Sequence, residues 1–169
     1  MFPITLMLLK SMADTATGGY FRDEMPRYAQ LICAAGHVLD ALAYLNEPPH
    51  WPEKLIDTCL AGRPGVDGTG CEIDDWARVL HHCAQHTSHR RAEIRAAVPD
   101  ALELILAHRQ SDGGWSNRPG GGVIQDGPLQ LTAGGPAGDL YGTCRLVDAA
   151  AMLIELSGWD LAGWKVLRR

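Results

Sequence analysis

The stretch Leu104–Trp115, which reads LILAHRQSDGGW, contains the pattern that decides the fold. An apolar helical segment ends there at a Gly-Gly turn, and an aromatic residue follows the turn. The same arrangement of an apolar helical segment and a glycine turn recurs upstream at Thr17–Tyr20 and, without an aromatic residue, at Gly62–Gly70. A further apolar helical segment begins after each turn. This repetition predicts pairs of helices joined by glycine-rich turns.

About five or six segments carry a helical pattern of apolar residues, in the ranges 4–13, 27–45, 52–61, 72–85, 92–109 and 139–156. Alternation of β-branched residues is scarce, and no Asn-Gly hairpin signal is present. Segments that follow the glycine turns, such as Asp148–Ile154, are rich in small and apolar residues, whereas Arg90–Arg109 carries more charge. We therefore predict one all-α domain over residues 1–169, with a buried and a water-facing layer of helices.

Composition excludes several classes of protein. The 169 residues, 46% of them hydrophobic, can bury one sizeable core. The formal charge of -5 provides no basic field, so we expect no nucleic-acid partner. The apolar run Met1–Leu9 is far shorter than the roughly 20 residues of a membrane span, and no basic residue precedes it as in a signal peptide. We expect a soluble, cytoplasmic protein without an integral membrane segment.

Cysteine and histidine spacing does not indicate a metal site or a disulfide framework. Five cysteines lie at wide and irregular intervals, which predicts reduced thiols. His82, His86 and His89 lie close together, but their spacing is typical of a solvated helix end rather than of a metal site.

The residues of Leu104–Trp115 resemble the QW motif of triterpene cyclases and related prenyltransferases. The resemblance rests on the aliphatic run, on Gln110 and on the Gly-x-Trp element that ends at Trp115. A glutamine at a helix end can bond to backbone groups that the helix leaves open, while the tryptophan covers it. Such a contact would tie one helical pair to the next.

A second element, Cys71–Ala77, resembles the D-x-D-D-T-A element of class II terpene cyclases. Glu72 stands at the first acidic position and Trp76 at the threonine position. In that family the middle aspartic acid is the proton donor that starts cyclisation, and the matching position is Asp74. The resemblance therefore implies an acid-catalytic role for Asp74.

A third element, Gly138–Cys144, is similar to the D-x-Y-H-T-C element of protein prenyltransferase β subunits. Gly142 stands where that family has its zinc-binding histidine, so we expect no zinc site and no cofactor. Together the three resemblances imply the α/α-toroid superfamily. A complete toroid has roughly six helical pairs and this chain supplies about three, which indicates a half toroid, a fragment or a partner in a larger ring.

The first functional hypothesis is an isoprenoid cyclase-like enzyme. In it, Asp74 protonates a terminal alkene or epoxide of a hydrophobic isoprenoid-like molecule, and Glu72 and Asp75 tune its pKa. The same acids could instead complement a helix N-terminus, with Thr69 or Cys71 near the cap, or could bind a metal or polar ligand.

Three aromatic residues and one further acid are the candidate substrate-binding groups. Trp76, Trp115 and Tyr141 could surround a carbocation with their π faces, or could pack in the core. Asp139 could be a helix N-cap, or could share the same cavity as Glu72.

The alternative hypothesis is a non-catalytic helical-repeat module. An open half toroid leaves apolar surface uncovered, which could bind a hydrophobic ligand or a partner protein, or could assemble with a second half as a homo-oligomer. The long stretch Ser116–Gly138 is crowded with glycine and proline, and we expect it to be either a functional or a mobile loop.

Overall fold

The six helices of the computed structural model begin and end within two residues of the predicted segments. They are α1 (Phe2–Met12), α2 (Tyr28–Tyr44), α3 (Pro52–Ala61), α4 (Gly70–Ala84), α5 (Arg91–Ala107) and α6 (Leu140–Ser157). The structure describes residues 2–66, 68–122, 125–126, 128–130, 132 and 134–159. Residues 1, 67 and 160–169 of the predicted domain therefore lie outside the described residues. The prediction of an all-α fold is confirmed for the part that is described.

Strand structure in the described residues is limited to one small antiparallel pair, β1 (Gln125–Asp126) and β2 (Leu129–Gln130). The pair lies within the glycine-rich stretch 116–138, in which residues 123, 124, 127, 131 and 133 are outside the described part. Two residues per strand form no packed sheet layer, so the pair does not change the fold class.

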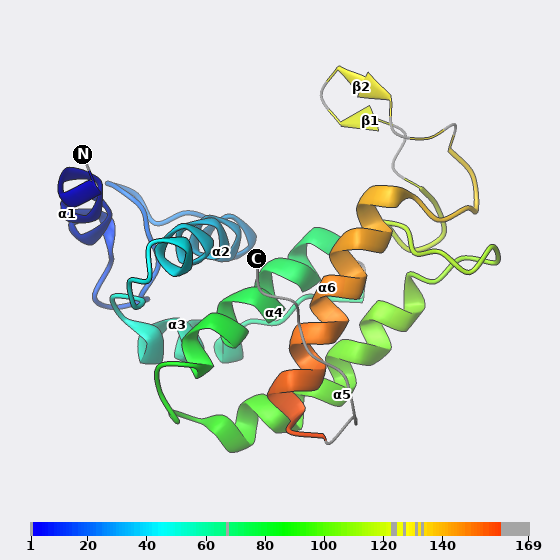
Figure 1. The fold of residues 1–169 in the computed structure, drawn as a ribbon. Helices are drawn as coiled ribbons and strands as arrows, with labels where there is room; N and C mark the ends of the chain where they lie inside the picture. Colours follow the sequence, from blue (N-terminus) through cyan, green and yellow to red (C-terminus); the bar gives the residue numbers. More distant parts are fainter. Residues whose placement is uncertain are drawn as a thin grey trace.

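The helices pack in two layers. Helix α4 contacts both α2 and α6, which makes a row in the order α2, α4, α6; α3 packs on α4, and α5 packs on α6. In Figure 1 the row runs across the molecule, and α1 lies beyond α2, at the end opposite α6. Ten of the 15 residues of α4 are buried, because α4 is covered on both flanks of the row and by α3. Helix α4 is thus the centre of the fold.

Trp76 is the largest side chain of the core and is 1% exposed. Its indole Nε1–H donates a hydrogen bond to the Cys59 carbonyl oxygen, at 2.9 Å, so the ring both fills the core and fixes α3 against α4. Fully buried apolar residues from α2, α3, α4 and α6 complete this core; they include Leu39, Leu55, Leu80, Leu146 and Leu153.

Two helix starts carry side-chain caps. The Thr69 hydroxyl accepts a hydrogen bond from the Glu72 amide, and the Glu72 carboxylate accepts one from the Thr69 amide at 2.7 Å, which together form a capping box. At α6, Asp139 accepts from the Gly142 amide at 2.5 Å. The capping alternatives for Glu72 and Asp139 are thus present in the structure.

The turn that follows α5 is closed by Gln110. Its side-chain amide donates to the His108 carbonyl oxygen at 3.0 Å and to the Ser116 hydroxyl at 2.7 Å. His108 is the C-cap residue of α5, so Gln110 bonds to a carbonyl group at the helix end, as expected. The Arg109 guanidinium lies over the Trp115 ring, with 5.9 Å between its central carbon and the ring centroid. These contacts hold the glycine turn against the helix.

Gly142 lies against the loop that leaves this turn, and a methyl group there would overlap the backbone of Ser116 and Asn117. The Asn117 amide donates to Asp139 at 3.1 Å, which holds the loop in place. We therefore expect Gly142→Ala to lower the free energy of unfolding by about 1–3 kcal/mol, the usual cost of overpacking.

Urea unfolding of Gly142→Ala beside Gly65→Ala tests this prediction. No atom lies within 4 Å of a methyl group at Gly65, so that variant should be as stable as the parent. An unchanged unfolding midpoint for Gly142→Ala would contradict the packing described above.

Candidate functional site

Asp74 lies in the second turn of α4, and no part of its side chain is exposed to solvent. Its Oδ2 atom accepts a hydrogen bond from Arg78 Nη2 at 2.6 Å and another from Arg145 Nη1 at 2.7 Å. Arg78 follows one turn later on α4, whereas Arg145 projects from α6. One carboxylate oxygen therefore joins two helices of the row through two ion pairs.

The ion pairs continue to α2. Arg78 Nη1 donates to Asp40 Oδ2 at 2.7 Å, and Arg78 Nη2 lies 3.5 Å from Asp148 on α6. The other oxygen of Asp40 lies 3.0 Å from His82 Nε2. We call Asp40, Asp74, Arg78, Arg145 and Asp148 the inner network, since it crosses the whole α2–α4–α6 row.

Two opposing effects act on the Asp74 carboxyl. Burial raises its pKa above the ordinary value of 3.8, while the charges and hydrogen bonds of Arg78 and Arg145 counteract that rise. The second oxygen, Oδ1, has no hydrogen-bond partner among the described residues. The site thus combines a feature of a proton donor, namely burial, with two guanidinium partners that favour the anion.

The three acids predicted to act together point to different neighbours. Asp74 bonds towards α6, and Glu72 turns back to the cap of its own helix. Asp75 is 5% exposed and lies beside Gly36 and Cys33 of α2, where the thiol donates a hydrogen bond to it. Burial raises the pKa of that thiol to about 11. The carboxylates therefore do not form a single acid cluster.

The candidate aromatic residues are also separated. Trp76 is in the core and Trp115 is at the turn after α5, with an indole Nε1 that is buried and has no described hydrogen-bond partner. The Arg145 guanidinium lies over the Tyr141 ring, with 5.4 Å between its central carbon and the ring centroid. The Tyr141 hydroxyl accepts a hydrogen bond from Cys71 Sγ at 3.0 Å. Of the three, Tyr141 is the one placed next to the inner network.

Sequence reasoning missed the arginines. Arg78 follows Asp74 at the i,i+4 spacing that favours a helical ion pair, so a scan for charge spacing could have found it. Arg145 is 71 positions from Asp74 along the chain, and no local pattern connects the two.

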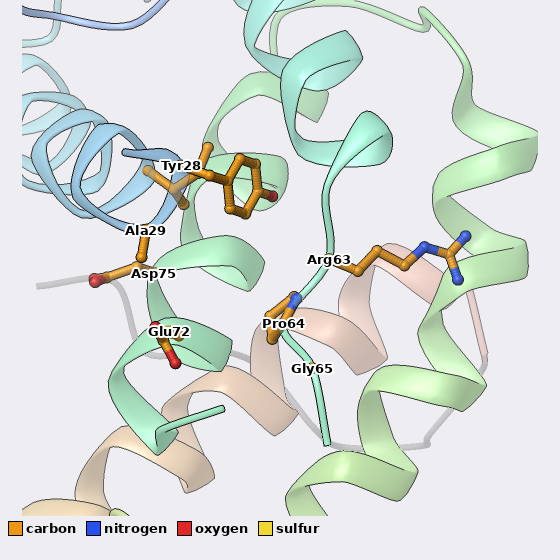
Figure 2. A pocket seen from close by; sticks show the side chains of 8 residues that line it. Tyr28, Ala29, Arg63, Pro64, Gly65, Glu72 and Asp75 are labelled. Atoms are coloured by element: carbon orange, nitrogen blue, oxygen red, sulfur yellow. The ribbon is translucent and has the colours of Figure 1, made fainter. Parts of the chain in front are cut away.

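A small pocket lies between α2, α4 and the loop that follows α3 (Figure 2). Its volume is about 100 Å³, and its lining residues are Tyr28, Ala29, Ile32, Arg63, Pro64, Gly65, Glu72 and Asp75. The Arg63 side chain points away from it, towards Asp100 at 3.2 Å. Sites for drug-sized ligands measure roughly 300–1,000 Å³, so this α2–α4 pocket does not accommodate a linear isoprenoid by itself.

A second pocket of about 200 Å³ lies where α4 ends, α5 begins and α6 ends. Its lining residues are His81, Ala84, Gln85, Arg91, Ile94, Arg95, Glu155 and Leu156, and we call it the end pocket. Neither pocket is lined by Asp74, Asp139 or the three candidate aromatic residues.

The histidines and cysteines make no metal cluster in the described part of the chain. His82 lies 3.0 Å from Asp40, and His89 Nε2 lies 2.8 Å from Asp57 Oδ1, so each is paired with one carboxylate. All five cysteines are free, as predicted. Within the described residues, no helix has the length and apolar character needed to cross a membrane.

Comparison with known protein families, with curated proteins and with solved structures gives no match for this chain. The geometry of its own residues therefore carries the functional argument.

Loss of the Asp74 charge would leave Arg78 and Arg145, whose side chains are 16% and 26% exposed, without their shared partner. We expect Asp74→Asn to lower the free energy of unfolding by about 1–3 kcal/mol, because Arg145 then loses its carboxylate partner while Arg78 keeps Asp40. Denaturant unfolding measures this change.

Asp148→Asn is the matched control. Its side chain is 49% exposed and lies 3.5 Å from Arg78, so its removal should change the free energy of unfolding by less than about 1 kcal/mol. Equal stability of the two variants would show that Asp74 does not hold the row together.

Proposed function

We propose that the chain is a non-catalytic helical-repeat module that assembles end to end with a second copy and thereby completes a ring of paired helices. The observation that carries this proposal is that the helices at both ends of the structure expose apolar side chains.

At one end, α6 presents an apolar stripe to solvent. Leu140 is 81% exposed and Val147 is 46% exposed, and Cys144 between them is also exposed. Their i, i+4, i+7 spacing places them on one face of the helix. Leu146 and Leu153, on the opposite face, are fully buried in the core. Helix α6 is therefore apolar on both faces.

At the other end, α1 presents a second stripe. Ile4, Met7 and Leu8 are 76%, 72% and 46% exposed, at i, i+3, i+4 spacing. Leu6 and Leu9 pack against the core instead. As on α6, the helix uses one apolar side for its own chain and leaves another uncovered.

Helical arrays that end in water normally carry polar outer faces on their terminal repeats. Apolar outer faces at both ends are typical of an array that continues into another layer of helices. Because the two stripes lie on different helices, a contact between the α1 stripe of one copy and the α6 stripe of another is head to tail. Such contacts close a ring when the rotations between successive copies add up to a full turn. Two copies of about three helical pairs would supply roughly six pairs.

The inner network agrees with a structural role. Its charged groups are engaged with one another across α2, α4 and α6. In this arrangement Asp74 maintains the spacing of the α2–α4–α6 row, which carries the α6 stripe at one end.

A pair of variants tests the head-to-tail contact. Met7→Glu places a charge on the α1 stripe, and Val147→Glu places one on the α6 stripe. We expect the parent chain to form a closed dimer and each variant alone to be a monomer, because each loses one side of every contact. An equimolar mixture should form a heterodimer through its one intact contact, as measured by size-exclusion chromatography with light scattering.

Leu129→Glu is the control, since Leu129 is 62% exposed but lies on β2 and belongs to neither stripe. It should assemble like the parent chain. Unfolding midpoints of all variants establish that each is folded. A monomeric parent chain, or a mixture that stays monomeric, would refute the assembly.

A second candidate is the isoprenoid cyclase-like enzyme, in which Asp74 donates a proton to an alkene or epoxide and Tyr141 stabilises the resulting cation. The observation that favours it is the buried Asp74 carboxyl with its raised pKa and an Oδ1 atom that accepts no hydrogen bond from the described residues. Completion of a ring would have to supply the substrate cavity.

Incubation of the assembled protein with linear isoprenoids of graded length tests this candidate. Cyclic products are expected from the parent chain and are expected to be lost in Asp74→Asn, compared at a temperature where circular dichroism shows both folded. Products that persist in Asp74→Asn, or that never form with the parent chain, would exclude the cyclase.

A further inference from the structure

The end pocket holds two arginines side by side. Arg91 and Arg95 lie in the first turns of α5 at i,i+4 spacing, so both guanidinium groups project from one face of the helix. The pocket also receives the ends of α4 and α6, and its volume of about 200 Å³ is twice that of the α2–α4 pocket.

These two guanidinium groups lack the carboxylate partners that four other arginines have. Arg63, Arg78, Arg90 and Arg145 each form an ion pair with a carboxylate. For Arg91 and Arg95, no carboxylate of the described residues lies within ion-pair distance. The pocket therefore contains two positive charges that the described chain does not neutralise.

Both side chains lie against the end of another helix. Arg91 Nη2 donates to the carbonyl oxygen of Ala84, the last residue of α4, at 3.3 Å. The Arg95 guanidinium lies against Gly158, the C-cap of α6, where a methyl group would be 3.0 Å from its Nη2. Each guanidinium has five N–H donors, so most of those donors stay available to a ligand.

The rest of the pocket lining is partly apolar. Ala84, Ile94 and Leu156 are its apolar lining residues, whereas Arg91 and Arg95 are exposed to solvent. The pocket lies beside the first two turns of α5. Two like charges four residues apart repel each other, and a bound anion between them removes that repulsion.

Glu155 is the one carboxylate in the lining, and it faces His81. The Gln85 amide lies 3.2 Å from His81 Nδ1, which makes Nδ1 the acceptor and leaves the Nε2–H to donate to Glu155 at 2.7 Å. This hydrogen bond directs the carboxylate charge to the buried His81. As an acidic side chain in the pocket lining, Glu155 opposes the binding of an anion.

We propose that the end pocket binds a small oxyanion, either a phosphate or a carboxylate, between the guanidinium groups of Arg91 and Arg95. Arginine pairs with both groups through two parallel N–H bonds, which makes the two oxyanions equivalent in recognition chemistry. The volume favours a ligand with few non-hydrogen atoms. This site is independent of the end stripes, so its failure and the failure of the proposed assembly are separate outcomes.

Isothermal titration calorimetry at low ionic strength, with inorganic phosphate and with succinate as probes, tests the site. We expect Arg91→Gln and Arg95→Gln each to weaken binding about tenfold or more, the range for loss of a charged hydrogen-bond partner. Arg95→Lys should weaken binding less than Arg95→Gln, because lysine keeps the positive charge and loses only the two parallel N–H donors of the guanidinium group. Glu155→Gln should tighten binding severalfold, because it removes a negative charge and keeps a hydrogen-bond acceptor for His81.

Arg22→Gln is the matched control, since Arg22 is exposed and lies outside the pocket. It should leave both affinities unchanged, and unfolding midpoints show which variants are folded. Tighter binding of one probe identifies the preferred oxyanion. Absence of binding by both probes at millimolar concentration, or binding that is unchanged in both arginine variants, would overturn the proposal.

Discussion

The structure depends on one carboxylate without access to water, which is shared by two arginines. Asp74 offers a single oxygen to Arg78 of its own helix and to Arg145 of α6. A buried charge of this kind is costly unless it is paired, and pairing requires α4 and α6 to keep one distance and one register. Because Arg78 also reaches Asp40, the same constraint extends to α2. The spacing of the three helices in the row is thus set by ion pairs as well as by the apolar core.

This constraint bears directly on function. A residue that protonates a substrate needs both a neutral carboxyl and contact with that substrate, whereas Asp74 is engaged with two cations and lines neither pocket. Within the described residues, the apolar stripes on α1 and α6 and the two arginines of the end pocket lie elsewhere. The proposed end-to-end assembly and the proposed anion site both use residues outside the inner network.

The positions of the acids show where reasoning from sequence was sufficient and where it was not. Consecutive residues of an α-helix point about 100° apart, so Asp74 and Asp75 could not be expected to share one face of α4. The capping box of Thr69 and Glu72 is written in four consecutive residues and could be predicted. The same holds for Gln110, whose bond to the end of α5 follows from the glycine turn beside it. The pairing of Arg145 with Asp74 spans 71 positions, and no local sequence pattern indicates it.

The sequence alone was enough to place the helical segments, the glycine-rich turns between them and the candidate caps of α4 and α6. Each of these depends on hydrophobic periodicity, backbone freedom or hydrogen bonds within one or two turns of chain. Tertiary structure alone decided which charge neutralises Asp74, which faces of α1 and α6 stay uncovered, and that Arg91 and Arg95 meet the ends of two other helices. The physical reason is that burial and pairing are set by how distant segments pack, and the free energy of a charge depends on its surroundings rather than on its position in the chain.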